Sequence, residues 1–258
     1  MVAATALALL AAFVQPVRLP ALAIAAVGFL LLRWRGSPVA MAWAAPLPIL
    51  ATFAWGITVS PIAEAGPFAC ESPLSAPALA RLAEAAGSVV LVLVLGRLMG
   101  AAPGLAGLRR PSRAIGALSL ALVAVLAPVA VLGFRPIAAP LFGSFDYSAS
   151  LPAVLVPALI FALANGALEE VVYRGAMLGW TARVIGWWPA AIAQAIVFGA
   201  AHSGPGFVGS AAPAVAVMGV AGLLAALVVR RTGSLLPAIA IHVALDVPLY
   251  LFIACRVA

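Results

Sequence analysis

Long apolar runs separated by short polar links dominate the pattern of hydrophobic and polar positions along the chain. Runs of about 20 apolar residues match the length of a helix that crosses a bilayer. The links carry Arg, Gly and Pro, which are typical of loops and turns between such helices. The pattern therefore predicts an all-α, polytopic bundle of transmembrane helices. From Arg33 onward, it places spans near 38–59, 78–99, 114–134, 150–178, 189–203, 208–229 and 235–254.

The start of the chain leaves the number of spans open. The apolar segments Val2–Val14 and Leu19–Leu32 are each short for a full span, and Gln15, Pro16 and Arg18 lie between them. They fit either two short helices in a hairpin or one kinked span with an interfacial leader, so the total is eight or nine. Val2–Val14 has no positive flank and no clear cleavage site after it, so we do not expect a removable signal peptide.

Composition excludes an ordinary soluble fold. The chain is 66% hydrophobic and 8% charged, whereas an average soluble domain has about 25% charged residues. Its net charge of +7 comes from Arg alone, because the sequence contains no Lys. Without basic runs interleaved with aromatic residues, we expect no nucleic-acid partner. The positive charge instead predicts cytoplasmic loops that contact membrane lipid headgroups.

The Arg clusters orient the predicted spans. If Arg33 faces the cytoplasm, alternating spans bring the clusters 109–113 and 230–231, together with Arg183, to the same side. This arrangement satisfies the positive-inside rule. The Arg-only, Ala-rich usage also indicates a GC-rich bacterial genome, and it predicts a multi-pass protein of the bacterial inner membrane.

The two cysteines, Cys70 and Cys255, both fall on the outer side in this topology, as do Glu64 and Glu71. A disulfide between them remains open if the outer compartment is oxidising. Their spacing resembles no metal or redox motif, and two free thiols are the preferred interpretation.

A charged motif, ALEEVVYRGAMLG, lies near the end of the apolar run that begins around residue 151. In an α-helix, Glu170 and Arg174 form an i,i+4 pair, whereas Glu169 points about a quarter-turn away. Asn165, Glu169 and Tyr173 recur every four residues and predict a polar stripe on that second face. A carboxylate outside the ion pair suits a general base. The alternative is a buried ion pair with a spare Glu that reaches the cytoplasmic interface.

Both histidines of the chain belong to short spaced motifs inside apolar runs. Phe198 and His202 are four residues apart in VFGAAHSG, and His242 and Asp246 are four apart in AIHVALDVP. A carboxylate one helical turn from an imidazole can fix its tautomer and orientation. A lone intramembrane His is more often a packing residue, but here both His and three of the seven acids fall in three downstream spans.

Helix geometry tests whether these polar groups can meet. At about 1.5 Å per residue, Glu169, His202, His242 and Asp246 lie roughly 10 to 20 Å from the cytoplasmic ends of their spans. We therefore expect them to face one polar pocket that opens toward the cytoplasm.

Taken together, three ordered motifs resemble the CAAX protease and bacteriocin-processing (CPBP, or Abi) family. They are E-E-x-x-x-R at 169–174, F-x-x-x-H at 198–202 and H-x-x-x-D at 242–246, and the resemblance covers about residues 150–254. Members of this family are intramembrane endopeptidases related to the CaaX protease that processes Ras. Asp246 stands where CaaX-processing members commonly have Asn, a departure that bears on CaaX specificity more than on the fold.

The resemblance implies that Glu169 activates a water that attacks a peptide carbonyl. His202 would help to hold that water, and His242, oriented by Asp246, would stabilise the oxyanion. It also implies N-terminal transmembrane helices over 1–113 and a catalytic membrane core over 114–258. The pair that would keep the base aimed is Glu170 and Arg174, and the residues expected to pack or to contact substrate are Phe198, Asn165 and Tyr173.

No cofactor is expected to be required. Glu169, His202, His242 and Asp246 are residue types that ligate zinc, but the sequence lacks H-E-x-x-H. The expected partners are membrane lipid and a peptide or protein substrate, while the sequence predicts neither the cleavage site nor an oligomeric state.

Two other functions remain open. One is a non-proteolytic scaffold or immunity protein of the same family, which would keep the fold and bind without cleaving. The other is a proton-coupled transporter, because Glu, His and Asp within spans also build proton relays. Against transport, the chain shows no internal repeat, and residues 38–59 and 114–134 contain no ionisable side chain.

Overall fold

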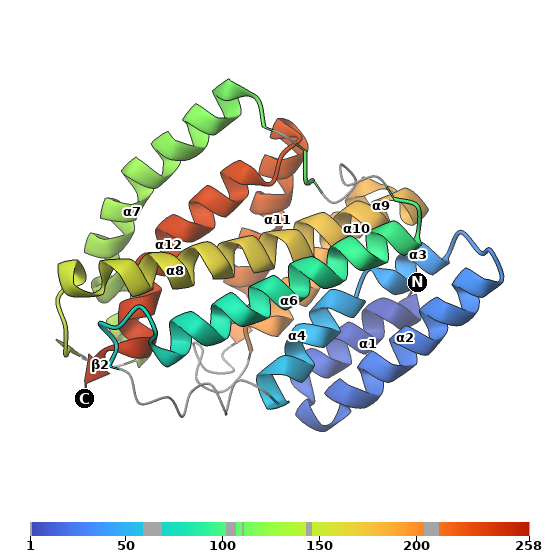
Figure 1. The fold of residues 1–258 in the computed structure, drawn as a ribbon, viewed down its shortest axis with the longest axis horizontal. Helices are drawn as coiled ribbons and strands as arrows, with labels where there is room; N and C mark the ends of the chain where they lie inside the picture. Colours follow the sequence, from blue (N-terminus) through green and yellow to red (C-terminus); the bar gives the residue numbers. More distant parts are fainter. Residues whose placement is uncertain are drawn as a thin grey trace. The chain divides into compact units, whose positions relative to one another are not determined.

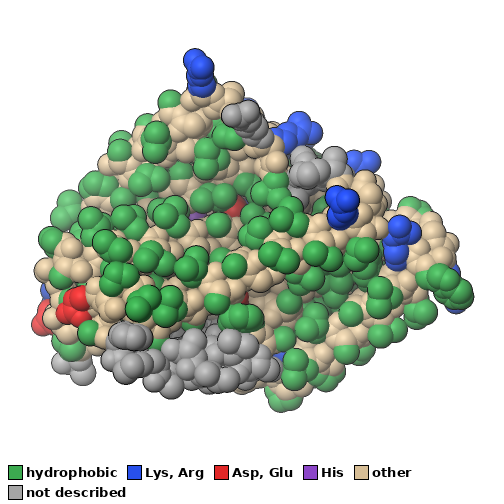
Figure 2. Space-filling model, in the orientation of Figure 1, with side chains coloured by type: hydrophobic (Ala, Val, Ile, Leu, Met, Phe, Trp, Pro, Cys, Tyr) green, Lys and Arg blue, Asp and Glu red, His purple; other side chains and the backbone are tan. Residues whose placement is uncertain are grey.

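The computed structural model describes residues 2–58, 69–101, 107–109, 111–142, 146–203 and 212–257. Of the residues used to orient the spans, Glu64 and Arg110 lie outside these ranges, as do the first residues of the predicted span 208–229. Six described helices are long and apolar enough to cross a membrane, and three shorter apolar helices accompany them. Figure 2 shows a face on which hydrophobic side chains predominate and charged ones are few. The predicted all-α membrane bundle is therefore confirmed, but the total of eight or nine spans is not.

The chain divides into two compact units. The first unit comprises Met1–Ile57, Ser88–Arg110 and Glu170–Leu235, and the second comprises Thr58–Gly87, Pro111–Glu169 and Leu236–Ala258. Each unit thus draws on distant parts of the sequence. The helix α6 (Ala76–Leu98) contributes residues to both units.

Helix α10 forms the centre of the first unit, where it packs against α11 and α1 (Figure 1). Close packing with α11 depends on glycine, because a Cβ on Gly199 would lie 2.5 Å from the carbonyl oxygen of Val215. At the start of the chain, a 3-10 turn at Gln15–Val17 separates two helices. The helices of this unit are α1 (Val2–Phe13), α2 (Arg18–Trp34), α3 (Ala40–Ala44), α4 (Leu47–Thr58), α9 (Gly179–Ile185), α10 (Trp187–Ala201) and α11 (Ala212–Thr232).

In the second unit, α12 (Leu236–Ala254) packs against α7 (Arg113–Phe142) and α8 (Leu151–Glu169) (Figure 1). Its core joins apolar side chains of α8 and α12, including Val154, Phe161, Val243 and Tyr250. On α6, Ala85 packs against Ala164 and Leu168 of α8. The strands β1 (Asp146–Tyr147) and β2 (Arg256–Val257) pair antiparallel.

The helix that carries the charged motif is not uniformly α-helical. Leu151–Ile185 is one continuous helix, but its segment η3 (Glu170–Leu178) is π-helical. The expectation of α-helical geometry through this motif was therefore wrong. A π-helix bonds each residue to the fifth one along, and such segments occur frequently at functional sites. The motif itself carries no pattern that separates a π turn from an α turn.

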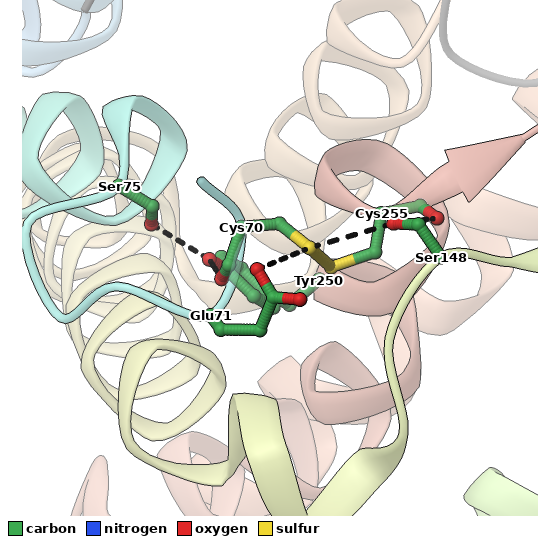
Figure 3. Close-up of a disulfide and its surroundings, with 6 residues drawn as sticks. All are labelled: Cys70, Glu71, Ser75, Ser148, Tyr250 and Cys255. Carbon is green, nitrogen blue, oxygen red and sulfur yellow. Dashed lines mark hydrogen bonds between the residues drawn. A yellow bond between two sulfur atoms is a disulfide. The ribbon is translucent and has the colours of Figure 1, made fainter. Parts of the chain in front are cut away.

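The expectation of free thiols was also wrong, because Cys70 and Cys255 form a disulfide (Figure 3). Their Cα atoms are 5.6 Å apart across a sequence separation of 185 residues. The Tyr250 hydroxyl donates to the Cys70 carbonyl and accepts from the Ser75 hydroxyl, each at 2.6 Å. The Ser148 hydroxyl donates to the Cys255 carbonyl. Folding thus brings the segment before α6 to the end of α12, a proximity that sequence spacing does not encode.

Candidate active site

Four polar side chains of α8 and α12 come together in the second unit: Asn165, Glu169, His242 and Asp246. We call this group the acid–imidazole cluster. The His242 Nε2 lies 3.4 Å from Glu169 Oε2 and 3.8 Å from Asp246 Oδ2. Asn165 Nδ2 donates to Asp246 Oδ2 at 2.8 Å. The Glu169, His242 and Asp246 side chains are 13%, 14% and 5% exposed, so these three side chains are largely buried.

A glycine one helical turn before Glu169 sets the separation of the two helices. A Cβ on Gly166 would lie 3.3 Å from both the Cβ of His242 and the carbonyl oxygen of Ile239. The distance to the His242 Cβ is shorter than the usual separation of carbon atoms in contact, about 3.5–4.0 Å. The absence of a side chain at Gly166 therefore lets α12 place His242 beside Glu169.

The family resemblance implied that Asp246 orients His242. The structure places these side chains 3.8 Å apart, which is longer than a direct hydrogen bond. Asp246 bonds instead to Asn165, which the sequence analysis treated as one member of a polar stripe. A contact of more than about 3.5 Å between polar groups can be bridged by water. One water molecule can therefore bridge His242 and Asp246.

An ion pair on α6 lies where this helix packs against α8, and none of the three motifs indicated it. Arg81 Nη1 lies 2.8 Å from Glu84 Oε2, and the Arg81 guanidinium lies 5.7 Å from the centre of the Phe161 ring on α8. Ala85, next to Glu84, packs against Ala164 and Leu168 of α8, the helix that carries Glu169. The available signal was the RLAE sequence inside an otherwise apolar predicted span.

The first unit contains a separate buried ion pair. Arg174 Nη1 donates to Glu170 Oε1 at 2.8 Å, and both side chains are only 1% exposed. The Arg174 guanidinium lies 4.2 Å from the centre of the Phe198 ring. The Tyr173 ring packs edge-on against the same phenylalanine, with centroids 5.0 Å apart. These contacts hold the π-helical segment against α10. They indicate a structural role for the Glu170–Arg174 ion pair.

His202 follows directly after α10, in the same unit. Its Nδ1 lies 2.7 Å from the Phe198 carbonyl oxygen. Because a carbonyl only accepts, Nδ1 carries the proton in this bond. Gln194, one turn before Phe198, is fully buried, and among the described residues its side-chain nitrogen and oxygen find no hydrogen-bond partner. Gln194 was not among the predicted site residues, although it shares the four-residue spacing of Phe198 and His202.

The predicted site residues thus fall into two groups. Asn165, Glu169, His242 and Asp246 lie together in the second unit, while Glu170, Tyr173, Arg174, Phe198 and His202 lie in the first. Each group thus belongs to a different one of the two units. A single pocket that contains both histidines stays a prediction.

The residue types named as zinc ligands were also compared with the arrangement that a metal ion needs, within the described part of the chain. There, no group of three or more His, Cys, Asp or Glu side chains is arranged to hold a metal ion. The expectation that no cofactor is required stays a prediction as well.

Buried carboxylates and an imidazole on membrane-spanning helices define a class: a multi-pass membrane protein with a polar site among its helices. Residues 150–248 match the protein family described as Rce1-like, type II CAAX prenyl endopeptidase. This segment, which carries all three motifs, belongs to the CAAX protease family, a family of membrane proteases. No curated protein and no solved structure matches the chain significantly.

Proposed function

We propose that the protein is an intramembrane endopeptidase in which Glu169 activates a water molecule to hydrolyse a peptide bond. One observation carries this proposal: the Glu169 carboxylate lies 3.4 Å from His242 Nε2 in a largely buried cluster. Both residues belong to the segment that matches an endopeptidase family. A carboxylate and an imidazole at this separation supply a base and a hydrogen-bond donor to one reacting centre.

In the proposed reaction, Glu169 takes a proton from water while the water oxygen attacks the peptide carbonyl carbon. The resulting oxyanion accepts a hydrogen bond from the His242 Nε2–H. Glu169 then passes its proton to the leaving nitrogen and the C–N bond breaks. The products are an amine and a carboxylic acid, which keeps the second proton of the water until it ionises. His202 enters the proposal through its motif, as a second group that holds the water.

Asn165 and Asp246 act as positioning residues in this proposal. The hydrogen bond from Asn165 fixes the Asp246 carboxylate, whose charge favours the Nε2–H imidazole as it begins to donate. Arg81 has an electrostatic role in this proposal, because its guanidinium compensates the Glu84 carboxylate, 2.8 Å away, where α6 packs against α8. This role extends the site to α6, outside the family-matched segment.

The proposed substrate is a peptide or protein that reaches the site from within or beside the membrane. The six candidate spans and the family match make this a multi-pass membrane protein. We further propose a bacterial inner membrane, with the disulfide between Cys70 and Cys255 on the oxidising outer side.

Proteomics of peptide termini tests the proposal in membranes that contain wild-type protein, Glu169→Ala or His202→Ala. Glu71→Ala is the matched control, because this acid is exposed and lies outside the cluster. We expect new termini with the wild type and the control, and their loss with both test variants.

Two results would replace the proposal. If all variants give the same termini, and the test variants instead lose uptake or efflux of a solute, the protein is a transporter. If Glu169→Ala preserves the biological phenotype and still binds a partner, the protein is a scaffold.

A further inference from the structure

At one end of the first unit, an exposed arginine rests on two tryptophan rings. The Arg230 guanidinium at the end of α11 lies 4.3 Å from the centre of the Trp187 ring and 5.5 Å from that of Trp188. The two rings meet edge-to-face, with centroids 4.8 Å apart. Within the described residues, no carboxylate pairs with Arg230. The guanidinium is therefore fixed in place while its N–H groups stay open to an anion.

An apolar groove begins at Trp188, the second of these tryptophans. It has a volume of about 440 Å³ and runs between α1, which contributes Thr5 and Leu9, and α10, which contributes Trp188, Ile192 and Ile196. Ile196 lies about 12 Å beyond Trp188 along the helix axis. The groove thus has a fixed cation near one end and an open apolar lining along about two turns of α10.

The apolar lining of this groove and the positive charge beside it indicate what kind of molecule it binds. Its lining is almost wholly hydrocarbon, and Trp188, Ile192 and Ile196 are each more than half exposed on a helix of a membrane protein. An acyl chain matches such a lining. Trp and Arg commonly lie together at the level of the lipid headgroups. Arg183, in the last turn of α9, and Arg231, beside Arg230, add positive charge at this end.

We propose that this site binds one anionic phospholipid, with its phosphate at Arg230 and one acyl chain in the groove between α1 and α10. Basic pockets between membrane helices recognise anionic headgroups on the cytoplasmic side, which is the side that the Arg clusters predict for this end. The lipid would hold α1 against α10 and so stabilise the first unit. This proposal does not depend on the proteolytic function.

Native mass spectrometry of the full-length protein tests the proposal with phosphatidylglycerol and phosphatidylcholine of identical acyl chains. We expect the wild type to retain phosphatidylglycerol preferentially. Arg230→Gln should weaken this retention about fivefold, the contribution of one arginine near a headgroup. The matched control is Arg231→Gln, which removes the same charge from an exposed neighbour without a tryptophan contact and should have a smaller effect.

A second pair of variants tests the groove. Ile192→Trp fills it from an exposed position and should reduce the retention of both lipids, whereas Leu224→Trp adds the same bulk to an exposed position on α11 outside the lining. Three results would overturn the proposal: equal retention of the two lipids by the wild type, equal losses for Arg230→Gln and Arg231→Gln, or no difference between Ile192→Trp and Leu224→Trp. A prenylated peptide that binds the wild type in place of either lipid would assign the groove to substrate instead.

Discussion

The buried ion pair between Glu170 and Arg174 gives a prediction that separates structure from catalysis. Arg174→Met keeps much of the side-chain volume but leaves the Glu170 carboxylate without its guanidinium, in a site where both side chains are 1% exposed. Breaking one partner of a buried pair costs about 3–5 kcal/mol. The substitution also removes the guanidinium from the Phe198 ring, 4.2 Å away. We therefore expect a loss of stability near the upper end of that range.

The double variant Glu170→Gln/Arg174→Met provides the critical comparison. Replacing both charges of a buried pair is often neutral or stabilising, so we expect it to recover most of the stability that Arg174→Met loses. The assay is reversible unfolding in mixed detergent micelles, followed by circular dichroism. As a control, Arg135→Gln breaks the pair with Asp146, whose side chains are 55% and 73% exposed, and should cost less than about 1 kcal/mol. The reasoning fails if Arg174→Met is as stable as wild type, or if the double variant is as unstable as the single one.

Three further predictions concern the second unit. Gly166→Ala should slow cleavage several-fold, because its Cβ would meet the Cβ of His242 at 3.3 Å. The control Gly87→Ala should leave the rate unchanged, because nothing lies within 4 Å of a Cβ there. Equal rates for the two variants would contradict the packing role of Gly166. Cys70→Ser opens a loop with a sequence separation of 185 residues and should lower the thermal midpoint, with about 5 kcal/mol as the upper limit from chain entropy; a midpoint equal to that of the oxidised wild type would contradict this. Arg81→Gln should slow the formation of cleaved peptides about tenfold, since the loss of about 1.4 kcal/mol of electrostatic stabilisation has that effect on a rate. The control Arg135→Gln should leave the rate of cleavage unchanged.

Local patterns in the sequence are sufficient for the features that depend on neighbouring residues. The lengths of the apolar runs predict the membrane helices, since the thickness of a bilayer sets that length. The four-residue spacing of Glu170 and Arg174 predicts their ion pair, which the structure forms. Likewise, the spacing of His242 and Asp246 places them on one face of α12.

Features that depend on distant segments did not follow from the sequence. The disulfide between Cys70 and Cys255 and the bond from Asn165 to Asp246 each join segments that only packing brings together. The pair on α6 was missed for a related reason: Arg81 and Glu84 acquire a role only when α6 lies against α8. All residues of the π-helix at 170–178 are buried, and local spacing does not report the contacts that surround them.

The central claim is that Glu169 deprotonates the water that hydrolyses the peptide bond. The most direct measurement follows oxygen-18 from labelled water into the newly formed carboxyl termini of membrane peptides, by mass spectrometry, for wild type and Glu169→Gln. This variant keeps the shape of the side chain and removes its basicity, and its thermal midpoint shows whether it is folded. The account predicts labelled termini with the wild type and none with folded Glu169→Gln. Labelled termini that form at the wild-type rate in Glu169→Gln would contradict it.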